Sequence, residues 1–189
     1  MAIAIASLFL YFVCLKPLTF HFNCRFVMSP PSLFEVPGWF SARASTRALL
    51  VAAIQTWDDT TISEQYIQQA LSQPNVEIEV LLSAYRYYFY KNNNAMALDV
   101  ALRVCDRIQQ TEQWSTCWEQ LKPILLERIE ESVVRLYLSA YAASGLLFAR
   151  LGQIAAAQAI AEQVQQLEAK EFGAEVLLTV LNPPPEEED

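Results

Sequence analysis

One stretch of the sequence decides the fold: residues 133–168 are VVRLYLSAYAASGLLFARLGQIAAAQAIAEQVQQLE. Leucine, alanine and glutamine dominate it, and all three favour helices. Apolar residues recur three and four positions apart on both sides of Leu151-Gly152, which is the period of an α-helix. Glycine readily takes the left-handed conformation that ends a helix. The stretch therefore predicts two helices, Val133 to Arg150 and Ile154 to Glu168, joined by a tight turn.

A second pair of helices is predicted upstream, over about residues 77–91 and 95–109. Lys91-Asn92-Asn93-Asn94 separates the two, and asparagine tolerates the left-handed conformation that such a turn needs. The helical period continues through both segments. We therefore expect a second antiparallel hairpin.

Weaker signals mark the remaining elements. One helix is expected after Ser41 and another over about residues 62–72. The turn Asp58-Asp59-Thr60-Thr61 offers an N-cap for the second helix, and Thr61 and Glu64 have capping-box spacing. Pro123 lies in the apolar stretch 112–129 and predicts a kink or the start of a new helix there. Residues 173–181 predict a short closing helix. The whole pattern predicts an all-α domain over residues 41–181.

Composition and charge exclude several classes of protein. The chain has only four glycines and a net charge of −8, so a β-sandwich, a glycine-rich phosphate loop and a general nucleic-acid role are all disfavoured. Cys105 and Cys117 have neither disulfide-scaffold nor zinc-site spacing. We interpret them as reduced, buried thiols of a cytoplasmic protein.

The two ends of the chain differ from its middle. Residues 2–15 are apolar but short for a membrane span, so residues 1–27 could be an uncleaved anchor, an atypical export signal or sequence upstream of a true start at Met28. We favour the last interpretation. Residues 28–40 are rich in proline and predict an irregular lead-in. Residues 182–189, NPPPEEED, predict a disordered acidic tail.

The two clearer hairpins resemble the tetratricopeptide repeat family, whose unit is a 34-residue helix-turn-helix. The matching residues are Tyr141, Gly145, Phe148, Gly152, Ala157 and Ala161 in the last pair, and Leu81, Tyr85, Tyr88, Asn92, Ala97 and Ala101 in the middle pair. The turns at Asn92 and Gly152 are 60 residues apart, so the stretch around Trp114 to Ile129 is an insertion between units. The resemblance implies hairpins stacked as a short α-solenoid. It also implies that Gly145 lies where two helices are closest.

A second resemblance rests on Ala84-Tyr-Arg-Tyr-Tyr-Phe-Tyr90, on Arg135-Leu-Tyr-Leu leading to Arg150-Leu-Gly, and on Gly173-Ala-Glu-Val-Leu-Leu. These strings are similar to small tetratricopeptide-type proteins encoded beside bacterial nitrogen-fixation genes. That resemblance implies an accessory factor in the assembly of a nitrogenase-type metalloenzyme.

Residues suited to catalysis are sparse. The single histidine, His21, lies in the doubtful leader, and the chain has no nucleophile elbow, Walker loop or dinucleotide fingerprint. We interpret Glu127, Glu130 and Glu131 as a solvated helix end. No cofactor, metal or enzymatic activity is therefore expected.

The aromatic run over Tyr85–Tyr90 is the most unusual feature of the chain. Its side chains surround the helix, so they cannot all face a core. One interpretation places Tyr85 and Tyr88 in the core and the other rings in half-exposed packing. The functional alternative is that Phe89 and Tyr90 help to line a binding groove. Carrying over the concave-face positions of the tetratricopeptide family selects Glu79, Leu82, Arg86, Phe89 and Tyr90 from the middle pair and Ser139, Ala142, Leu146, Ala149 and Arg150 from the last pair.

The family resemblance implies a non-catalytic adaptor or assembly chaperone that grips a protein partner in a helical groove. Leu82 and Ala142 replace the residues with which some relatives clamp a terminal carboxylate. The expected ligand is therefore an amphipathic or extended segment with a few acidic residues, which Arg86 and Arg150 would anchor. The alternative is a structural protein tethered to a membrane through residues 2–15.

Overall fold

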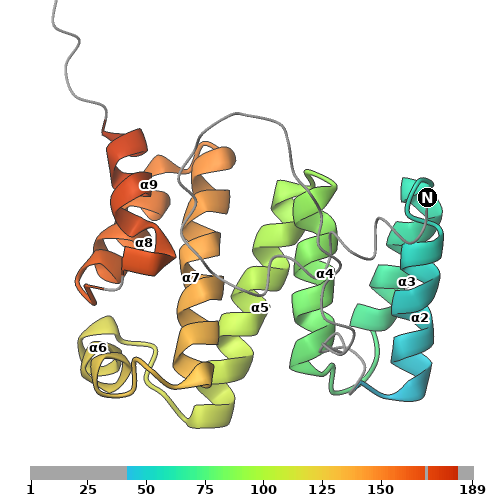
Figure 1. Ribbon diagram of the computed structural model, residues 1–189, viewed down its shortest axis with the longest axis horizontal. Coiled ribbons are helices and arrows are strands. Elements are labelled where there is room, and N and C mark those ends of the chain that lie inside the picture. Colours follow the sequence, from blue (N-terminus) through green and yellow to red (C-terminus); the bar gives the residue numbers. More distant parts are fainter. Residues whose placement is uncertain (1–41, 169, 183–189) are drawn as a thin grey trace, which may run out of the picture. The chain divides into compact units, whose positions relative to one another are not determined.

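A computed structural model describes residues 42–168 and 170–182 (Figure 1). Its regular elements are helices, and no strand occurs within these two ranges, so the all-α prediction is confirmed. The chain divides into two compact units, Met1–Ala70 and Leu71–Asp189, and each is described by itself. The predictions for residues 1–41, and for the tail from Pro183 onward, lie outside the described residues.

The first unit contains α2, Ala44–Gln55, and all of α3, Thr60–Leu71, except its last residue. The side chain of Asp59 caps the N-terminus of α3, because its Oδ1 accepts a hydrogen bond from the backbone N–H of Ile62 at 3.1 Å. The predicted capping box at Thr61 and Glu64 was therefore wrong, and Thr61 lies inside the helix. Aspartate and threonine are both good capping residues, so the sequence offered two neighbouring choices.

The second unit starts with the predicted middle hairpin, α4, Ile78–Tyr90, and α5, Asn94–Glu112. Asn92 has the left-handed conformation that the turn was expected to need, with φ 56°. The Oδ1 of Asn93 accepts from the backbone N–H of Met96 at 3.3 Å and so caps α5. The hairpin and its asparagine turn are therefore confirmed.

The stretch predicted as an insertion forms one short helix, α6, Trp118–Glu127. Pro123 lies in its interior and not in its first turn, so the alternative in which this proline starts a helix was wrong. Proline lacks the N–H that would bond to the carbonyl oxygen of Glu119. Glu119 is exposed, so water can satisfy that oxygen.

Three further helices complete the second unit: α7, Ser132–Arg150; α8, Ile154–Gln165; and α9, Ala174–Leu181, which follows the 3-10 turn η2, Lys170–Phe172. The turn glycine Gly152 has φ +76°. The last hairpin and the closing helix are thus confirmed. The three helices alternate in direction along the chain (Figure 1), so α7 and α9 run the same way.

Gly145 lies where α7 meets α8 and α9. A methyl group added to its Cα would be 3.0 Å from Cγ2 of Ile160 on α8 and 3.4 Å from Cδ2 of Leu177 on α9. Since carbon atoms in ordinary contact are about 3.5–4.0 Å apart, a side chain at this position would require Ile160 to move. The close contact expected at Gly145 is therefore present.

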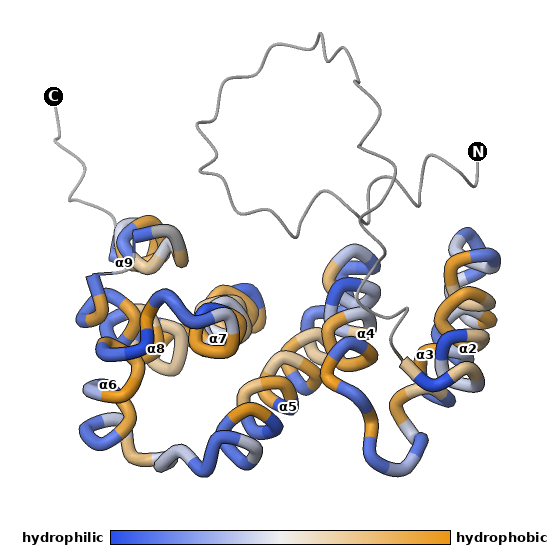
Figure 2. The backbone as a smooth tube through the Cα atoms, turned by 60° about the horizontal axis from the view of Figure 1, so that its bottom comes forward, coloured by the Kyte–Doolittle hydropathy of each residue, from blue (hydrophilic) through white to orange (hydrophobic). Residues whose placement is uncertain are grey.

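Within the second unit, α4 packs against α5, α5 against α7, α7 against α8, and α8 against α9. Hydrophobic and hydrophilic residues alternate along most of the coiled helices (Figure 2), whereas α9 exposes Val176 and Val180. Among the described residues, α7 is the one helix that is long and apolar enough to cross a membrane. A core helix commonly has the same length and composition, and Val134, Leu138 and Leu147 of α7 are fully buried.

Candidate functional site

The outward face of α4 is determined by the residues that this helix buries. Val80, Ala84, Tyr87 and Tyr88 are buried, whereas Tyr85 is only half-buried. Tyr88 is thus a core residue as expected, but the assignment of Tyr85 to the core was wrong and Tyr87 takes that place. Spacings of four and three from Val80 through Ala84 to Tyr87 give one buried stripe. Tyr85 and its neighbours on the other side of the helix are left for a surface.

That surface, called here the α4–α7 surface, consists of Tyr85, Arg86, Phe89 and Tyr90 from α4 and Arg150 from the end of α7. The guanidinium carbon of Arg150 lies 4.8 Å from the ring centroid of Phe89, which is cation–π geometry. Tyr85 and Phe89 have ring centroids 5.9 Å apart, and Phe89 and Tyr90 meet edge to face at 6.0 Å. Phe89 and Arg150 are 61 positions apart in the sequence, so residues from two different helices form one cluster.

The cluster is electrostatically positive. Burial raises the pKa of the Tyr85 hydroxyl above its ordinary value, while the nearby charges of Arg150 and Arg86 act in the opposite direction. Burial also lowers the pKa of Arg86, but arginine stays protonated in proteins. Among the described residues, neither Arg86 nor Arg150 has a carboxylate within 4 Å. As far as the described residues show, the surface therefore holds two guanidinium groups and no neutralising acid.

The other predicted binding residues occupy the same faces of the two helices without a specific contact in this cluster. Leu82 and Glu79 are half-buried at positions four and seven residues before Arg86, so they extend its face toward the start of α4. Leu146 is 37% exposed and lies one turn before Arg150. The hydroxyl of Ser139 donates to the carbonyl oxygen of Arg135 on its own helix, at 2.8 Å.

One predicted surface position belongs to the core instead. Ala142 packs, together with Tyr141 and Phe148, against the buried cluster of Ile160, Val164 and Ala174. The expectation that Ala142 lines a groove was therefore wrong. Its small side chain serves the close packing of α7 on α8 that Gly145 also permits.

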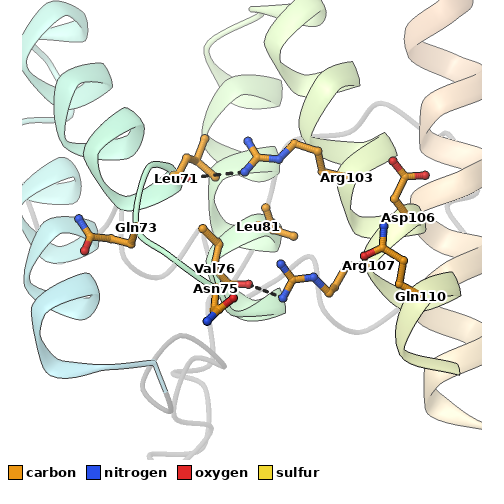
Figure 3. Close-up of a pocket in the computed structure, with 9 residues that line it drawn as sticks. All are labelled: Leu71, Gln73, Asn75, Val76, Leu81, Arg103, Asp106, Arg107 and Gln110. Atoms are coloured by element: carbon orange, nitrogen blue, oxygen red, sulfur yellow. Dashed lines mark hydrogen bonds between the residues drawn. The ribbon is translucent and has the colours of Figure 1, made fainter.

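A cavity of about 350 Å³ lies elsewhere in the second unit, between α5 and the loop that follows α3 (Figure 3). Arg107 donates to the carbonyl oxygen of Val76 at 2.9 Å, and Arg103 to that of Leu71 at 3.5 Å. Arg103 also lies 3.9 Å from Asp99. Because both guanidinium groups bind this loop, we assign the cavity a structural role.

A stack of aromatic rings fastens the insertion to α7. Trp118 stacks on Tyr141, Tyr141 on Tyr137, and Trp114 meets Tyr137 edge to face, with centroids 6.1, 5.7 and 5.6 Å apart. Arg128 lies over Trp114 and makes ion pairs with Glu112 at 3.0 Å and Glu131 at 2.7 Å. Sequence analysis placed these tryptophans in an insertion but gave no sign of the stack.

Cys105 and Cys117, two of the four cysteines of the chain, have different surroundings. Cys105 is buried as expected, but Cys117 is exposed, so the expectation that both are buried was wrong for Cys117. Burial raises the pKa of the Cys105 thiol to about 12. Cys105 therefore stays protonated at neutral pH and is a weak nucleophile.

No set of three or more histidine, cysteine, aspartate or glutamate side chains in the described part of the chain could hold a metal ion. Glu127, Glu130 and Glu131, interpreted above as a solvated helix end, are all exposed.

Comparisons with protein-family models, with curated proteins and with solved structures found no significant match.

Proposed function

We propose that this chain is a non-catalytic, tetratricopeptide-like binding module that holds a segment of a protein partner on the α4–α7 surface. The observation that carries the proposal is the contact of Arg150 with Phe89 at 4.8 Å. It brings together two residues that were selected independently as binding positions in two separate hairpins. Such a meeting is expected if the first helices of successive hairpins are neighbours, as in a repeat stack.

The order of helix packing further supports a repeat arrangement. The first helix of the last hairpin, α7, packs against α5, the second helix of the preceding hairpin. The insertion helix α6 is held on α7 by Trp118 and Tyr141, so it does not separate the two hairpins.

The chemistry of the surface favours a peptide over a small molecule. Tyrosine and arginine are among the residue types most enriched at binding hot spots, because tyrosine offers a large contact area and arginine several donors. Tyr85, Phe89 and Tyr90 form a continuous set of rings, and Arg86 and Arg150 add charges without a described carboxylate partner. An extended segment with aromatic or proline contacts and an acidic residue fits this set.

The test is selection of random displayed peptides with the full chain, followed by affinity measurement with Arg86→Ala/Tyr90→Ala. Hot-spot truncations cost about 2 kcal/mol or more, so we expect at least about a tenfold loss of affinity for the selected peptides. Helicity should remain, because both side chains are half-buried on the outer side of α4.

Glu162→Ala/Gln165→Ala on α8 is the matched control, since both residues are exposed. That variant should bind the peptides as the unaltered chain does. Peptides that bind the unaltered chain and Arg86→Ala/Tyr90→Ala equally well would exclude the α4–α7 surface as the binding site.

A further inference from the structure

The sequence after α9 is chemically complementary to the α4–α7 surface. Residues 183–189 are three prolines followed by three glutamates and an aspartate. Proline-rich segments bind aromatic surfaces, because the extended polyproline conformation is favoured before binding. Carboxylates bind arginine through paired, charge-assisted hydrogen bonds. The surface offers both partners, rings from Tyr85, Phe89 and Tyr90 and charges from Arg86 and Arg150.

The geometry of the last three helices places the end of α9, after which this segment follows, level with Arg150. Gly145 of α7 faces Leu177 of α9, and the two helices run in the same direction (Figure 1). Arg150 is five residues beyond Gly145, and Asn182 is five residues beyond Leu177. Since an α-helix rises about 1.5 Å per residue, both lie about 7.5 Å further along. The chain thus leaves α9 at the end of α7 that carries Arg150.

The order of residues around α7 gives the segment a path. At 3.6 residues per turn, Leu146 is about 100° and Arg150 about 140° around the helix from Gly145. A chain that crosses α7 from α9 in that direction meets the exposed Leu146 first and Arg150 next. Arg150 itself lies against Phe89 of α4, so the path continues onto the aromatic rings.

The segment is long enough for this path. Neighbouring helix axes are roughly 8–10 Å apart, and an extended proline-rich chain covers about 3.1 Å per residue. The four steps from Asn182 to Glu186 can therefore span about 12 Å, enough to reach Arg150. Two further residues can add about 6 Å, in the direction of Arg86.

The chemistry of Arg150 also allows a change of partner. Arg150 is exposed, and a carboxylate can bind its guanidinium through two parallel hydrogen bonds, which the face of a ring cannot supply. A carboxylate that arrives at Arg150 can therefore compete with the ring of Phe89 or bind beside it.

We propose that residues 183–189 of this same chain occupy the α4–α7 surface and must be displaced by any partner that binds there. The inference rests on the proposed function and adds its regulation. It also describes the partner: a segment that displaces the tail should present proline or aromatic contacts next to carboxylates.

The test uses the full chain with Glu186→Gln, Glu187→Gln and Glu188→Gln together, which removes the competing charges and keeps the length. The probe is a fluorescent peptide of sequence NPPPEEED with both ends blocked, and its anisotropy is measured against each protein. A tethered segment has an effective concentration in the millimolar range, so the unaltered chain should bind the probe about tenfold more weakly than the triple variant. Adding Arg86→Gln and Arg150→Gln to the triple variant should abolish binding, and the probe NPPPQQQD should not bind.

Equal affinity of the unaltered chain and the triple variant would overturn the proposal, and so would a triple variant that does not bind the probe. Sedimentation velocity provides the check on the intramolecular contact, for which a monomer is expected. A dimer that dissociates in the triple variant would overturn it and assign the tail to a second copy. If displayed peptides still require Arg86 and Tyr90 while the tail probe fails, only this inference is wrong and the proposed function stands.

Discussion

Gly145 is the position at which one side chain tests the packing of α7 on α8 and α9. Even a methyl group there would lie 3.0 Å from Ile160 and 3.4 Å from Leu177. Leucine adds four carbon atoms, so both neighbours must move. Overpacking costs about 1–3 kcal/mol, and four atoms with almost no free space put the cost near the upper end. Leucine recovers roughly 0.8 kcal/mol of helix propensity over glycine.

We therefore expect Gly145→Leu to lower the free energy of unfolding by about 2 kcal/mol and the melting temperature by about 4–8 °C. Urea unfolding followed by far-ultraviolet circular dichroism measures the free energy. Ala159→Leu is the matched control, because Ala159 is exposed on α8 and surface substitutions change stability by less than about 0.5 kcal/mol.

A double variant identifies the clash itself. Ile160→Ala alone should destabilise the fold, but Gly145→Leu combined with Ile160→Ala should cost less than the sum of the two changes, because the leucine fills the vacated volume. The reasoning is refuted if Gly145→Leu unfolds at the same urea concentration as the unaltered chain. Additive costs in the double variant would show that the leucine is accommodated somewhere other than against Ile160.

Two further predictions concern the hydrogen bond from Arg107 to the loop after α3, and Cys105 and Cys117. Arg107→Leu removes the hydrogen bond to Val76, so it should lower stability by about 1 kcal/mol and speed proteolysis within residues 72–77. Unchanged cleavage would show that this hydrogen bond does not hold the loop. Under native conditions near neutral pH a maleimide should modify Cys117 and leave Cys105 intact until the chain unfolds, because burial raises the pKa of Cys105 to about 12. Folding favours the protonated Cys105 thiol, so the thiol's contribution to the free energy of unfolding is full below its unfolded pKa. That contribution is lost as the pH rises toward about 12. A Cys105→Ala variant should therefore lose less stability over that interval.

The helices and turns could be predicted because their signals are local. Asn92 and Gly152 both have positive φ, and each is a residue type that adopts this conformation at low cost. The residues of α7 repeat with a helical period that a single window can detect. The start of α3 was misplaced because Asp59 and Thr61 are both capping residues, and only the hydrogen bond to Ile62 distinguishes them.

The aromatic run shows where periodicity stops being informative. Four of the five residues from Tyr85 to Phe89 are aromatic, so the contrast between apolar and polar positions that identifies a core face is absent. Tyr87 is buried and Tyr85 is not, and this difference depends on how other helices pack around α4. The spacing from Val80 and Ala84 fits Tyr87, and counting from those two small apolar residues would have corrected the assignment.

No local pattern in the sequence predicts the contact of Arg150 with Phe89. The two residues are 61 positions apart, and between them lie α5, a helix of 19 residues, and the insertion helix α6. Their contact requires that α7 pack on α5 as though α6 were not there. This packing is possible because α6 lies to one side. Trp118 of α6 stacks on Tyr141, and Trp118 and Lys122 both donate hydrogen bonds to Gln166. The insertion therefore leaves the α4–α7 surface intact, and a chain in which Trp118 cannot stack should lose the docking of α6 before it loses this surface.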